Sequence, residues 1–383
     1  MANIKTAVIG TGFIGPAHIE GIRRLGYVDV VALAEENDQV ARQKADALCI
    51  PQAFGNYRDL LADKSIQAVH ICTPNFLHYE MVKAALEAGK HVVSEKPLAM
   101  NSKESGELVA MAREKGLQNA VNFNYRFYPL VQEARQKIAA GEPGKVRLVH
   151  GSYLQDWLLF DTDWNWRLEP GVGGDSRAVA DIGSHWCDLL TYITGQKIVE
   201  VYAKLDTIVP SRKKPKGRVE TFTGSGTGDF EQVAIKTEDT ASVMFKMFNG
   251  AVGNFMVSQV SPGRKNRLYF EIDCERMSFV WDQENPDSMW IGYRDKANQV
   301  LMRDGSLLSP QAAAFAHYPG GHPEGYPDLL KNFFDRFYAP IAKGTPIKTG
   351  ELPPYADFAA GDYEVRVVEA ILTSNKKQAW VSL

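Results

Sequence analysis

The chain has few cysteines, no long apolar run and no excess of positive charge, and each shortage excludes a class of protein. Its four cysteines, Cys49, Cys72, Cys187 and Cys274, show neither the spacing of a disulfide framework nor that of a zinc site. Without a run of about 18 apolar residues, we expect no membrane-spanning helix. A formal net charge of −3 offers no positive field for nucleic acid. The chain enters its first strand without an apolar signal segment, so we expect a cytoplasmic protein with reduced thiols.

Glycine is concentrated in one informative loop, Gly10-Thr11-Gly12-Phe13-Ile14-Gly15. An apolar strand pattern precedes the loop and a helical pattern follows it, which is the context that a dinucleotide-binding fingerprint requires. The three glycines permit a tight turn, a close approach of the backbone to a pyrophosphate and close packing of the helix. Five residues of this loop, Gly10, Gly12, Phe13, Ile14 and Gly15, are therefore predicted cofactor contacts. The alternative is a glycine-rich turn that binds nothing.

Glu35 follows the third glycine at the spacing expected of a ribose ligand, at the end of a predicted strand, Val28–Ala34. A carboxylate there can accept hydrogen bonds from both ribose hydroxyls. Glu36 comes next, and the first basic residue after it is Arg42, so the 2′-phosphate of NADP would meet negative charge without a nearby cation. The sequence predicts NAD as the cofactor.

Two kinds of strand pattern divide the chain near residue 123. Residues 4–122 alternate continuous apolar strands with helices, which is typical of a parallel sheet covered on both faces. We therefore expect an α/β protein with an N-terminal NAD-binding Rossmann fold, residues 1–123. Later strands alternate apolar and polar residues, so residues 124–383 are expected to form an α+β domain with an open, mainly antiparallel sheet for substrate binding and oligomerisation. Within it, residues 210–230 are expected to form a long loop.

Ser94-Glu95-Lys96-Pro97 lies at the carboxyl end of a predicted parallel strand, the edge of an open sheet where ligands bind. A lysine held there can donate to a substrate oxygen or remove its proton. Pro97 is a candidate cis proline. The alternative is that Lys96 is a solvated surface lysine.

Asp181 and His185 lie four residues apart in a predicted helix that ends at Gly195, so both side chains share one face. A carboxylate near an imidazole raises its proton affinity and orients it, and such a pair can relay a proton from an alcohol. The alternatives are an N-cap aspartate with a core histidine, and a zinc site. The zinc site lacks a third ligand at a convincing spacing.

Aromatic and polar residues are interleaved between residues 153 and 167. Trp157, Trp166 and Arg167 are candidate sugar ligands, because aromatic rings pack on the CH face of a sugar while polar groups bind its hydroxyls. Core packing is the alternative for the tryptophans. His322 and Tyr326 belong to a later Pro/Gly-rich segment that can either close over the substrate or pack as a surface loop.

These motifs together resemble the Gfo/Idh/MocA family, the glucose–fructose oxidoreductase and inositol 2-dehydrogenase family. The resemblance runs in order over nearly the whole chain. It includes the glycine loop with His18, the Cys72-Thr73-Pro74-Asn75 segment with His78, the Glu95-Lys96-Pro97 segment, Asn124-Tyr125-Arg126-Phe127, and Asp181-Ile182-Gly183-Ser184-His185. The tryptophan-rich segment resembles the sugar dehydrogenase branch, which includes levoglucosan dehydrogenase.

The resemblance implies that Lys96, Asp181 and His185 are the catalytic group. It implies that Thr73, Pro74, Asn75, His78, Glu95 and Lys96 line the cofactor site, and that Asn122 and Arg126 reach nicotinamide or substrate. It also implies that the open sheet forms the interface of a homodimer or homotetramer.

The motifs and the resemblance predict an NAD-dependent oxidoreductase that oxidises a secondary ring hydroxyl of a sugar, anhydrosugar or inositol to a ketone, with hydride transfer to NAD. His185 is assigned the role of base and Lys96 the polarising role, and the reverse assignment stays open. Two alternatives remain: an NAD-dependent glycosidase that uses transient oxidation, and a non-catalytic sugar or NAD sensor. Neither nucleic acid nor a membrane is an expected partner.

Overall fold

The computed structural model describes residues 3–169, 172–216, 229–345 and 353–383. The chain forms two compact units. The first comprises Met1–Asn124 and Tyr326–Val365, and the second comprises Tyr125–Gly325 and Arg366–Leu383. The first unit thus includes a late segment that the sequence analysis assigned to the second domain.

The first unit is built on a parallel six-stranded sheet with the strand order β3-β2-β1-β4-β5-β6. Its strands are β1 (Ile4–Ile9), β2 (Val28–Ala34), β3 (Gln52–Phe54), β4 (Ala68–Ile71), β5 (His91–Ser94) and β6 (Asn119–Val121). Every residue of β4 is buried, as expected of a central strand covered on both faces. The strand order reverses between β1 and β4, and in such sheets ligands bind at the carboxyl ends of the strands beside the reversal. The predicted Rossmann fold is confirmed.

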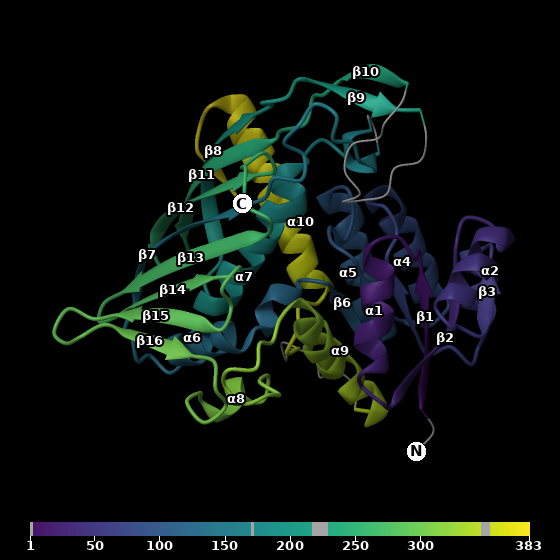
Figure 1. Cartoon of the computed structure of the whole chain (residues 1–383), viewed down its shortest axis with the longest axis horizontal. Helices are drawn as coiled ribbons and strands as arrows, with labels where there is room; N and C mark the ends of the chain where they lie inside the picture. Colours follow the sequence, from purple (N-terminus) through teal and green to yellow (C-terminus); the bar gives the residue numbers. More distant parts are fainter. Residues whose placement is uncertain (1–2, 170–171, 217–228, 346–352) are drawn as a thin grey trace. The chain divides into compact units, whose positions relative to one another are not determined.

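The helices of this unit are α1 (Ile14–Arg23), α2 (Asp38–Ala47), α3 (Tyr57–Ala62), α4 (His78–Glu87), α5 (Ser102–Lys115) and α9 (Tyr326–Ala342). Helix α9 lies beside α1 (Figure 1). The two helices come close because Gly21 of α1 has no side chain: a Cβ there would lie 3.0 Å from the ring of Phe334. The Tyr338 hydroxyl also donates to Oγ1 of Thr6, at 2.8 Å. These contacts explain why the segment that follows Gly325 belongs to the first unit.

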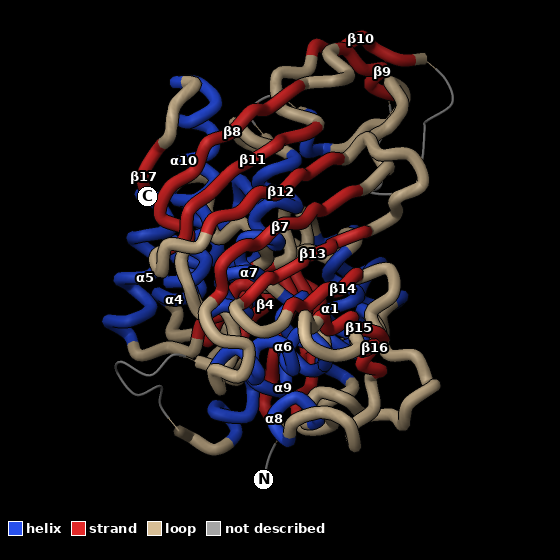
Figure 2. The backbone as a smooth tube through the Cα atoms, turned by 90° about the vertical axis from the view of Figure 1, so that its left-hand side faces the viewer, coloured by secondary structure: helices blue, strands red, loops and turns tan. Residues whose placement is uncertain are grey.

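The second unit is built on a nine-stranded sheet with the order β16-β15-β14-β13-β7-β12-β11-β8-β17, and Figure 2 shows most of these strands side by side. The β7–β12 pair is parallel and the other pairs are antiparallel, so the prediction of a mainly antiparallel sheet is confirmed. The strands are β7 (Val146–Leu154), β8 (Ile198–Asp206), β11 (Thr240–Met247), β12 (Val252–Ser258), β13 (Arg267–Cys274), β14 (Ser278–Asp282), β15 (Ser288–Gly292), β16 (Gln299–Met302) and β17 (Val381–Ser382).

One face of this sheet is buried and the other is open. In β11, buried residues alternate with partly or fully exposed ones, as expected of a strand with one covered face. Helices α6 (Pro129–Ala139) and α7 (Ser184–Thr194) pack on the buried face, where the Trp186 ring stacks on Phe255 with the ring centroids 4.5 Å apart. A short helix, α8 (Pro310–Ala313), follows the last hairpin. The long helix α10 (Phe358–Lys377) begins in the first unit and ends in the second.

The prediction of one long loop over residues 210–230 is wrong at both ends. Ser211–Pro215 forms β9, which pairs in antiparallel fashion with β10, Phe230–Ala234. The polar composition misled the prediction, because the Arg212 side chain of β9 is fully buried by polar partners rather than solvated. The intervening residues 217–228 lie outside the described part of the chain.

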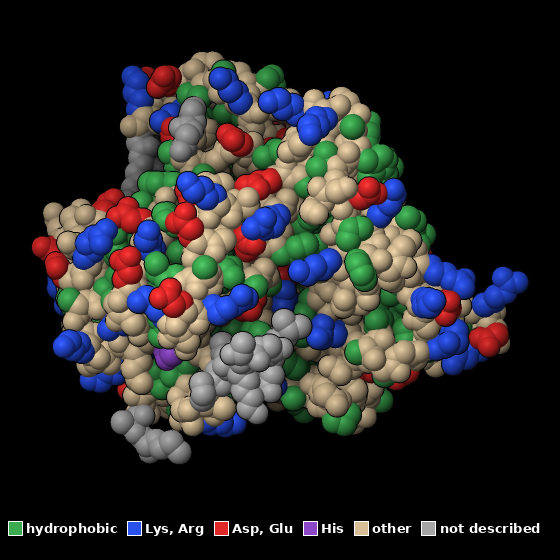
Figure 3. All heavy atoms as spheres, turned by 180° about the vertical axis from the view of Figure 1, so that it is seen from behind, with side chains coloured by type: hydrophobic (Ala, Val, Ile, Leu, Met, Phe, Trp, Pro, Cys, Tyr) green, Lys and Arg blue, Asp and Glu red, His purple; other side chains and the backbone are tan. Residues whose placement is uncertain are grey.

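Two further expectations from the sequence were that the surface carries no positive field for nucleic acid and that no helix spans a membrane. On the face drawn in Figure 3, Lys and Arg side chains are intermixed with Asp and Glu side chains. Among the described helices, none combines the length and hydropathy needed to cross a membrane.

Candidate active site

The glycine loop has the geometry that its sequence predicts. Gly10 has a φ of +87°, and a Cβ there would lie 2.9 Å from the Cys72 carbonyl oxygen. A Cβ on Gly15 would lie 2.4 Å from the Gly10 carbonyl oxygen, so α1 can begin against the turn only with glycine here. At Gly12, no atom of the described chain lies within 4 Å of the Cβ position. The loop therefore leaves open space at the position where a pyrophosphate would approach the backbone.

Glu35 lies beside this loop. Its Oε1 accepts hydrogen bonds from the Thr11 backbone N–H, at 2.6 Å, and from the Thr11 hydroxyl. The following residue, Glu36, is exposed. Arg42 forms an i,i+4 ion pair with Asp46, at 2.7 Å. The end of β2 thus presents negative charge to the loop, as the prediction of NAD requires.

His78 joins the loop that follows β4 to the loop that follows β5. Its ring is fully buried, with Nε2 2.8 Å from the Thr73 carbonyl oxygen and Nδ1 2.6 Å from that of Pro97. Burial lowers the pKa of His78, whereas its bonds to the two carbonyls oppose that shift. The structure therefore gives His78 a role in holding the predicted cofactor segment, which continues through Pro74 and Asn75 into the 3-10 turn Asn75–Leu77.

Glu95, the residue before Lys96, begins a chain of buried hydrogen bonds. His18 of α1 contacts the Glu95 carboxylate through Nε2, at 2.9 Å, and Nδ1 of His70 through its own Nδ1, at 2.8 Å. The His70 ring continues to the Tyr338 hydroxyl, at 2.7 Å. Burial acts to raise the pKa of Glu95, but His18, together with Asn122 and Lys96, outweighs it and lowers that pKa to about 2. The residue before Lys96 is therefore an ionised carboxylate, and the Lys96–Pro97 peptide bond is cis, as predicted.

Asn122 shows that this edge of the sheet suits a nicotinamide cofactor. Its Nδ2 donates to Glu95, whereas its buried Oδ1 has no hydrogen-bond partner in the described part of the chain. A buried amide oxygen without a donor is costly unless a ligand supplies one, and a nicotinamide carboxamide carries two N–H donors. The open space at Gly12, the carboxylate of Glu35 and this acceptor fit a dinucleotide.

In the second unit, Asp181 lies in a single π-helical turn, Val179–Gly183, directly before α7. Single π turns within α-helices are frequent at functional sites. The N–H groups that open this turn are capped by Glu238, whose Oε1 accepts from the backbone of Arg177 and of Val179, each at 2.9 Å. The carboxylate of Asp181 instead accepts from Gln259 Nε2, at 2.8 Å. The alternative that Asp181 is an N-cap is therefore wrong.

His185 lies in the first turn of α7, with its ring edge-on to that of Tyr125 at a centroid distance of 5.0 Å. Tyr125 belongs to a closed polar ring with Tyr153 and Asn266. Asn266 Nδ2 donates to the Tyr125 hydroxyl, at 2.9 Å, and Asn266 Oδ1 accepts from the Tyr153 hydroxyl, at 2.7 Å. The two hydroxyls are 2.6 Å apart. This hydrogen-bonded ring fixes the Tyr125 and Tyr153 side chains, both of which lie beside His185.

The same network reaches Trp157. Gln155 donates to Asn266 Oδ1 and accepts from the Trp157 indole N–H, each at 2.9 Å. Sequence reasoning missed Tyr153, Gln155 and Asn266 as parts of this network, because only the pairing of β7 with β13 brings them together.

The predicted sugar ligands have different environments. Arg167 lies over the Trp166 ring, 4.4 Å from its centroid, with its Nε 3.3 Å from Asp181 Oδ1. Trp164 belongs to a buried apolar cluster, and Trp157 packs against that cluster. Arg167 is thus brought to Asp181 with the Trp166 ring stacked on it, whereas Trp157 packs against an apolar cluster.

Three other predicted residues contact different parts of the chain. The Arg126 guanidinium is buried against the Asp188 carboxylate, so its charge has a structural partner. His322 is exposed, in a loop whose carbonyls are bound by Arg303. Tyr326 lies in the first unit, where its hydroxyl accepts from Asn124 at 3.0 Å.

Two further expectations from the sequence were reduced cysteine thiols and, as an alternative reading of Asp181 and His185, a zinc site. All four cysteines are free thiols. Among the described residues, the one grouping of ligand atoms close enough for a metal is His150, Glu271 and Asp273, on β7 and β13. It includes neither Asp181 nor His185.

The chain is similar to known proteins over its whole length. Residues 4–123 match the oxidoreductase family with an NAD-binding Rossmann fold, and residues 131–280 match the GFO/IDH/MocA C-terminal domain. The levoglucosan dehydrogenase of Pseudarthrobacter phenanthrenivorans is 29% identical over 100% of this chain and 99% of its own length.

Two solved structures share this architecture. A levoglucosan dehydrogenase in complex with NADH and levoglucosan has a TM-score of 0.87 and 27% identity, covering 100% of this chain and 99% of that chain. An inositol dehydrogenase homologue from Azotobacter vinelandii, complexed with NAD+, has a TM-score of 0.87 and 26% identity, covering 100% of this chain and 98% of that chain.

Proposed function

Because the chain belongs to the Gfo/Idh/MocA family of oxidoreductases with an NAD-binding Rossmann fold, we propose that it oxidises a secondary ring hydroxyl of a sugar, anhydrosugar or inositol to a ketone. The observation that carries this proposal is the setting of Asp181 and His185. The Asp181 carboxylate is held by side-chain donors in a π turn, and His185 follows at the start of α7. A carboxylate and an imidazole so placed suit the removal of a proton from an alcohol.

We assign the proton chemistry to Lys96, Asp181 and His185. His185 accepts the hydroxyl proton, Asp181 orients the imidazole, and Lys96 polarises the substrate oxygen, with the roles of Lys96 and His185 open to exchange. Bound NAD supplies the acceptor for the hydride that leaves the substrate carbon. The glycine loop, Glu35 and the Asn122 carboxamide hold that cofactor.

The substrate class rests on the surroundings of Asp181. Arg167, which is stacked on the Trp166 ring beside Asp181, offers donors for hydroxyl groups, and Trp166 and Trp157 are the aromatic rings that we propose for the CH face of the ring. The full-length similarity to a levoglucosan dehydrogenase makes levoglucosan the first compound to test.

The test is the formation of NADH, followed by absorbance, with a panel of inositols, monosaccharides, glycosides and levoglucosan. We expect turnover with at least one neutral ring polyol, and more slowly with NADP than with NAD. Silence with every compound, while NAD binding is demonstrated, would overturn the dehydrogenase. Hydrolysis of a glycoside with retained NAD and no net NADH would instead favour the glycosidase.

We further propose that the open face of the nine-stranded sheet pairs two copies of the chain. The side chains of Leu148, Met244, Val252 and Met256 on this face are between 38% and 48% exposed. They lie on the neighbouring strands β7, β11 and β12, where Leu148 is paired with Val252 and Met244 lies diagonally across from Val252 and Met256. The four apolar side chains are thus neighbours on one face, with polar residues such as Asn254 among them. Such a surface on a sheet is typical of an interface.

A further inference from the structure

Gln259, directly after β12, connects Asp181 to a buried arginine. Its side chain is fully buried, with Nε2 2.8 Å from Asp181 Oδ2 and Oε1 3.0 Å from Arg177 Nη1. A guanidinium has donors only, so the amide oxygen must face Arg177 and the amide nitrogen must face Asp181. Gln259 can therefore only donate to Asp181, and the orientation of its amide is not free.

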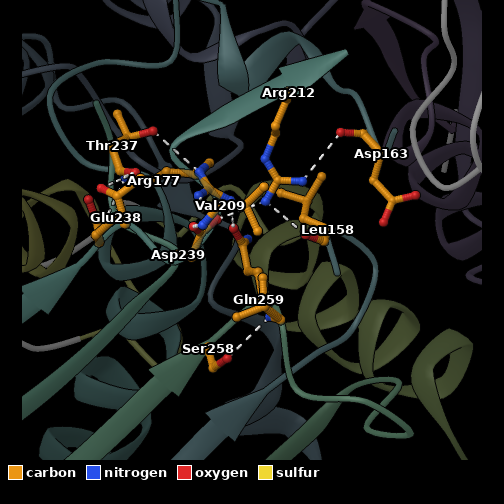
Figure 4. A network of polar contacts seen from close by, with 12 residues as sticks. Leu158, Asp163, Arg177, Val209, Arg212, Thr237, Glu238, Asp239, Ser258 and Gln259 are labelled. Carbon is orange, nitrogen blue, oxygen red and sulfur yellow. Dashed lines mark hydrogen bonds and ion pairs between the residues drawn. The ribbon is translucent and has the colours of Figure 1, made fainter. Parts of the chain in front are cut away.

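Arg177 is itself immobilised by an ion cluster of three fully buried side chains, Arg177, Asp239 and Arg212 (Figure 4). Asp239 Oδ1 accepts from both guanidinium groups. Its Oδ2 accepts from the Val209 backbone N–H, at 2.7 Å. A buried charge that loses its partner is strongly penalised, so Arg177 is held in place.

The other side of Gln259 is fixed by the backbone. Its N–H donates to the Asp239 carbonyl, at 3.0 Å. The same aspartate thus positions both the main chain of Gln259 and the arginine that aligns its side chain. Arg212 extends the cluster to β9, where its guanidinium donates to the carbonyls of Leu158 and Phe160, at 2.8 and 2.7 Å.

From this geometry we propose that Gln259 is a positioning residue, which Arg177 locks as a donor so that the Asp181 carboxylate is held in place as a charged acceptor. The proposal rests on the proposed function, in which Asp181 orients His185. Arg167 already approaches Oδ1 of Asp181 as a cation, at 3.3 Å. The neutral amide of Gln259 holds Oδ2 without bringing the Arg177 guanidinium into contact with the carboxylate, so a second direct ion pair is avoided and the carboxylate can still act on the imidazole.

Three other polar groups face Asp181. Arg167 approaches Oδ1 from the 3-10 turn Trp166–Leu168, and His185 follows on α7. Tyr125 precedes α6, and burial, with a smaller contribution from the charge of Asp181, raises the pKa of its phenol. Gln259 differs from Arg167 because its side chain is fully buried and held by the ion cluster, whereas the Arg167 side chain is 22% exposed.

Two variants of Gln259 separate positioning from packing. Q259L keeps the volume and removes the donor, so we expect kcat to fall roughly 10- to 100-fold with NAD affinity unchanged. Q259E keeps the shape and places a second carboxylate against Asp181. The two carboxylates then share a proton, and Arg177 favours ionisation of the new one. The acid limb of the kcat/KM profile should therefore move to higher pH, with activity recovering in alkali.

The matched control is Q132M. Gln132 is an equally buried glutamine of the second unit, on α6, bonded to the Arg126 carbonyl and the Tyr192 hydroxyl. We expect Q132M to lower the melting temperature without moving the pH profile. If Q259L keeps kcat within about threefold of wild type and Q259E keeps the wild-type profile, the proposal is overturned. A loss of activity in Q259E that is equal at every pH would also overturn it.

A double-mutant cycle tests the contact without using activity. If Gln259 supports the charge of Asp181, Q259E should lower the melting temperature less in D181N than in the wild-type background, because D181N removes the opposing carboxylate. Additive shifts would overturn the proposal even if the enzyme is active. Coupled shifts in a protein that oxidises no polyol would uphold the positioning of Asp181 and refute the proposed function alone.

Discussion

At the scale of single residues, we propose that Glu35 selects NAD over NADP. Two hydrogen bonds from Thr11 fix its carboxylate beside the glycine loop. The exposed Glu36 adds charge of the same sign, and Arg42 is paired with Asp46. A fixed carboxylate accepts from ribose hydroxyls and repels a 2′-phosphate, so we attribute the proposed preference for NAD over NADP to the end of β2.

We predict that E35A weakens NAD binding roughly 10-fold or more, because hydrogen bonds to a charged group contribute about 1.5–3 kcal/mol. The ratio of NAD to NADP affinity should shrink as well. Fluorescence titration with both cofactors measures the two effects. E36A is the control, with a smaller change in the ratio; an unchanged ratio in E35A would contradict the role of Glu35.

The proposed proton chemistry makes a second prediction at the residue scale. K96A and H185A should each lower turnover by roughly 10²–10⁴, the range of general acid–base groups, while NAD still binds. Steady-state kinetics and NAD titration measure the two properties. K103A, at an exposed lysine of α5, should retain full activity. Near-normal turnover in K96A or H185A would remove that residue from the mechanism.

At the scale of elements, the hydrogen-bond chain from Glu95 through His18 and His70 to Tyr338 connects the segment after β5 with α1, β4 and α9. Burial, with the neighbouring His18, holds the pKa of His70 well below its ordinary range, so this ring is neutral inside the unit. The carboxylate before Lys96 therefore depends on helices that are remote in sequence.

The ionised Glu95 carboxylate should make the free energy of unfolding depend on pH in the acid range. The folded-state pKa of Glu95, about 2, lies below its ordinary value of 4.5. Its contribution to the free energy of unfolding is therefore present above pH 4.5 and is lost as the pH falls through about 2. Wild type should lose up to about 3 kcal/mol relative to E95Q between pH 5 and pH 2. Urea unfolding at a series of pH values measures the difference. If the free energy of unfolding falls equally with pH in wild type and E95Q, this role of Glu95 is contradicted.

Local patterns predicted the elements of the first unit, because their signals are adjacent in sequence. Strands are continuously apolar there, and helices end on glycines such as Gly116, which has a φ of +61°. The fingerprint loop and the Lys96 segment were found for the same reason. The partners of Asp181 were not predicted, because Gln259 is 78 residues away and approaches only through sheet pairing. The β9 strand was not predicted because its sequence is polar and basic, which is typical of an exposed loop, whereas its Arg212 side chain is in fact buried.

At the scale of the whole molecule, the open face of the nine-stranded sheet decides the assembly that we propose. M256E places a charge among its apolar side chains, so we expect the molar mass in light scattering to fall toward that of a monomer. L307E alters an apolar side chain that is 59% exposed in a loop outside the sheet, and should leave the mass unchanged. A monomeric wild type, or an M256E protein of unchanged mass, would contradict this interface.

The central claim is that the chain moves a hydride from a secondary ring carbon to NAD. The most direct measurement uses levoglucosan, or the best compound of the panel, deuterated at the carbon that is oxidised, with mass spectrometry of the cofactor formed. We predict reduced cofactor that carries one deuterium, together with a ketone product. Cofactor recovered only as unlabelled NAD, beside unchanged or merely hydrolysed substrate, would contradict the claim.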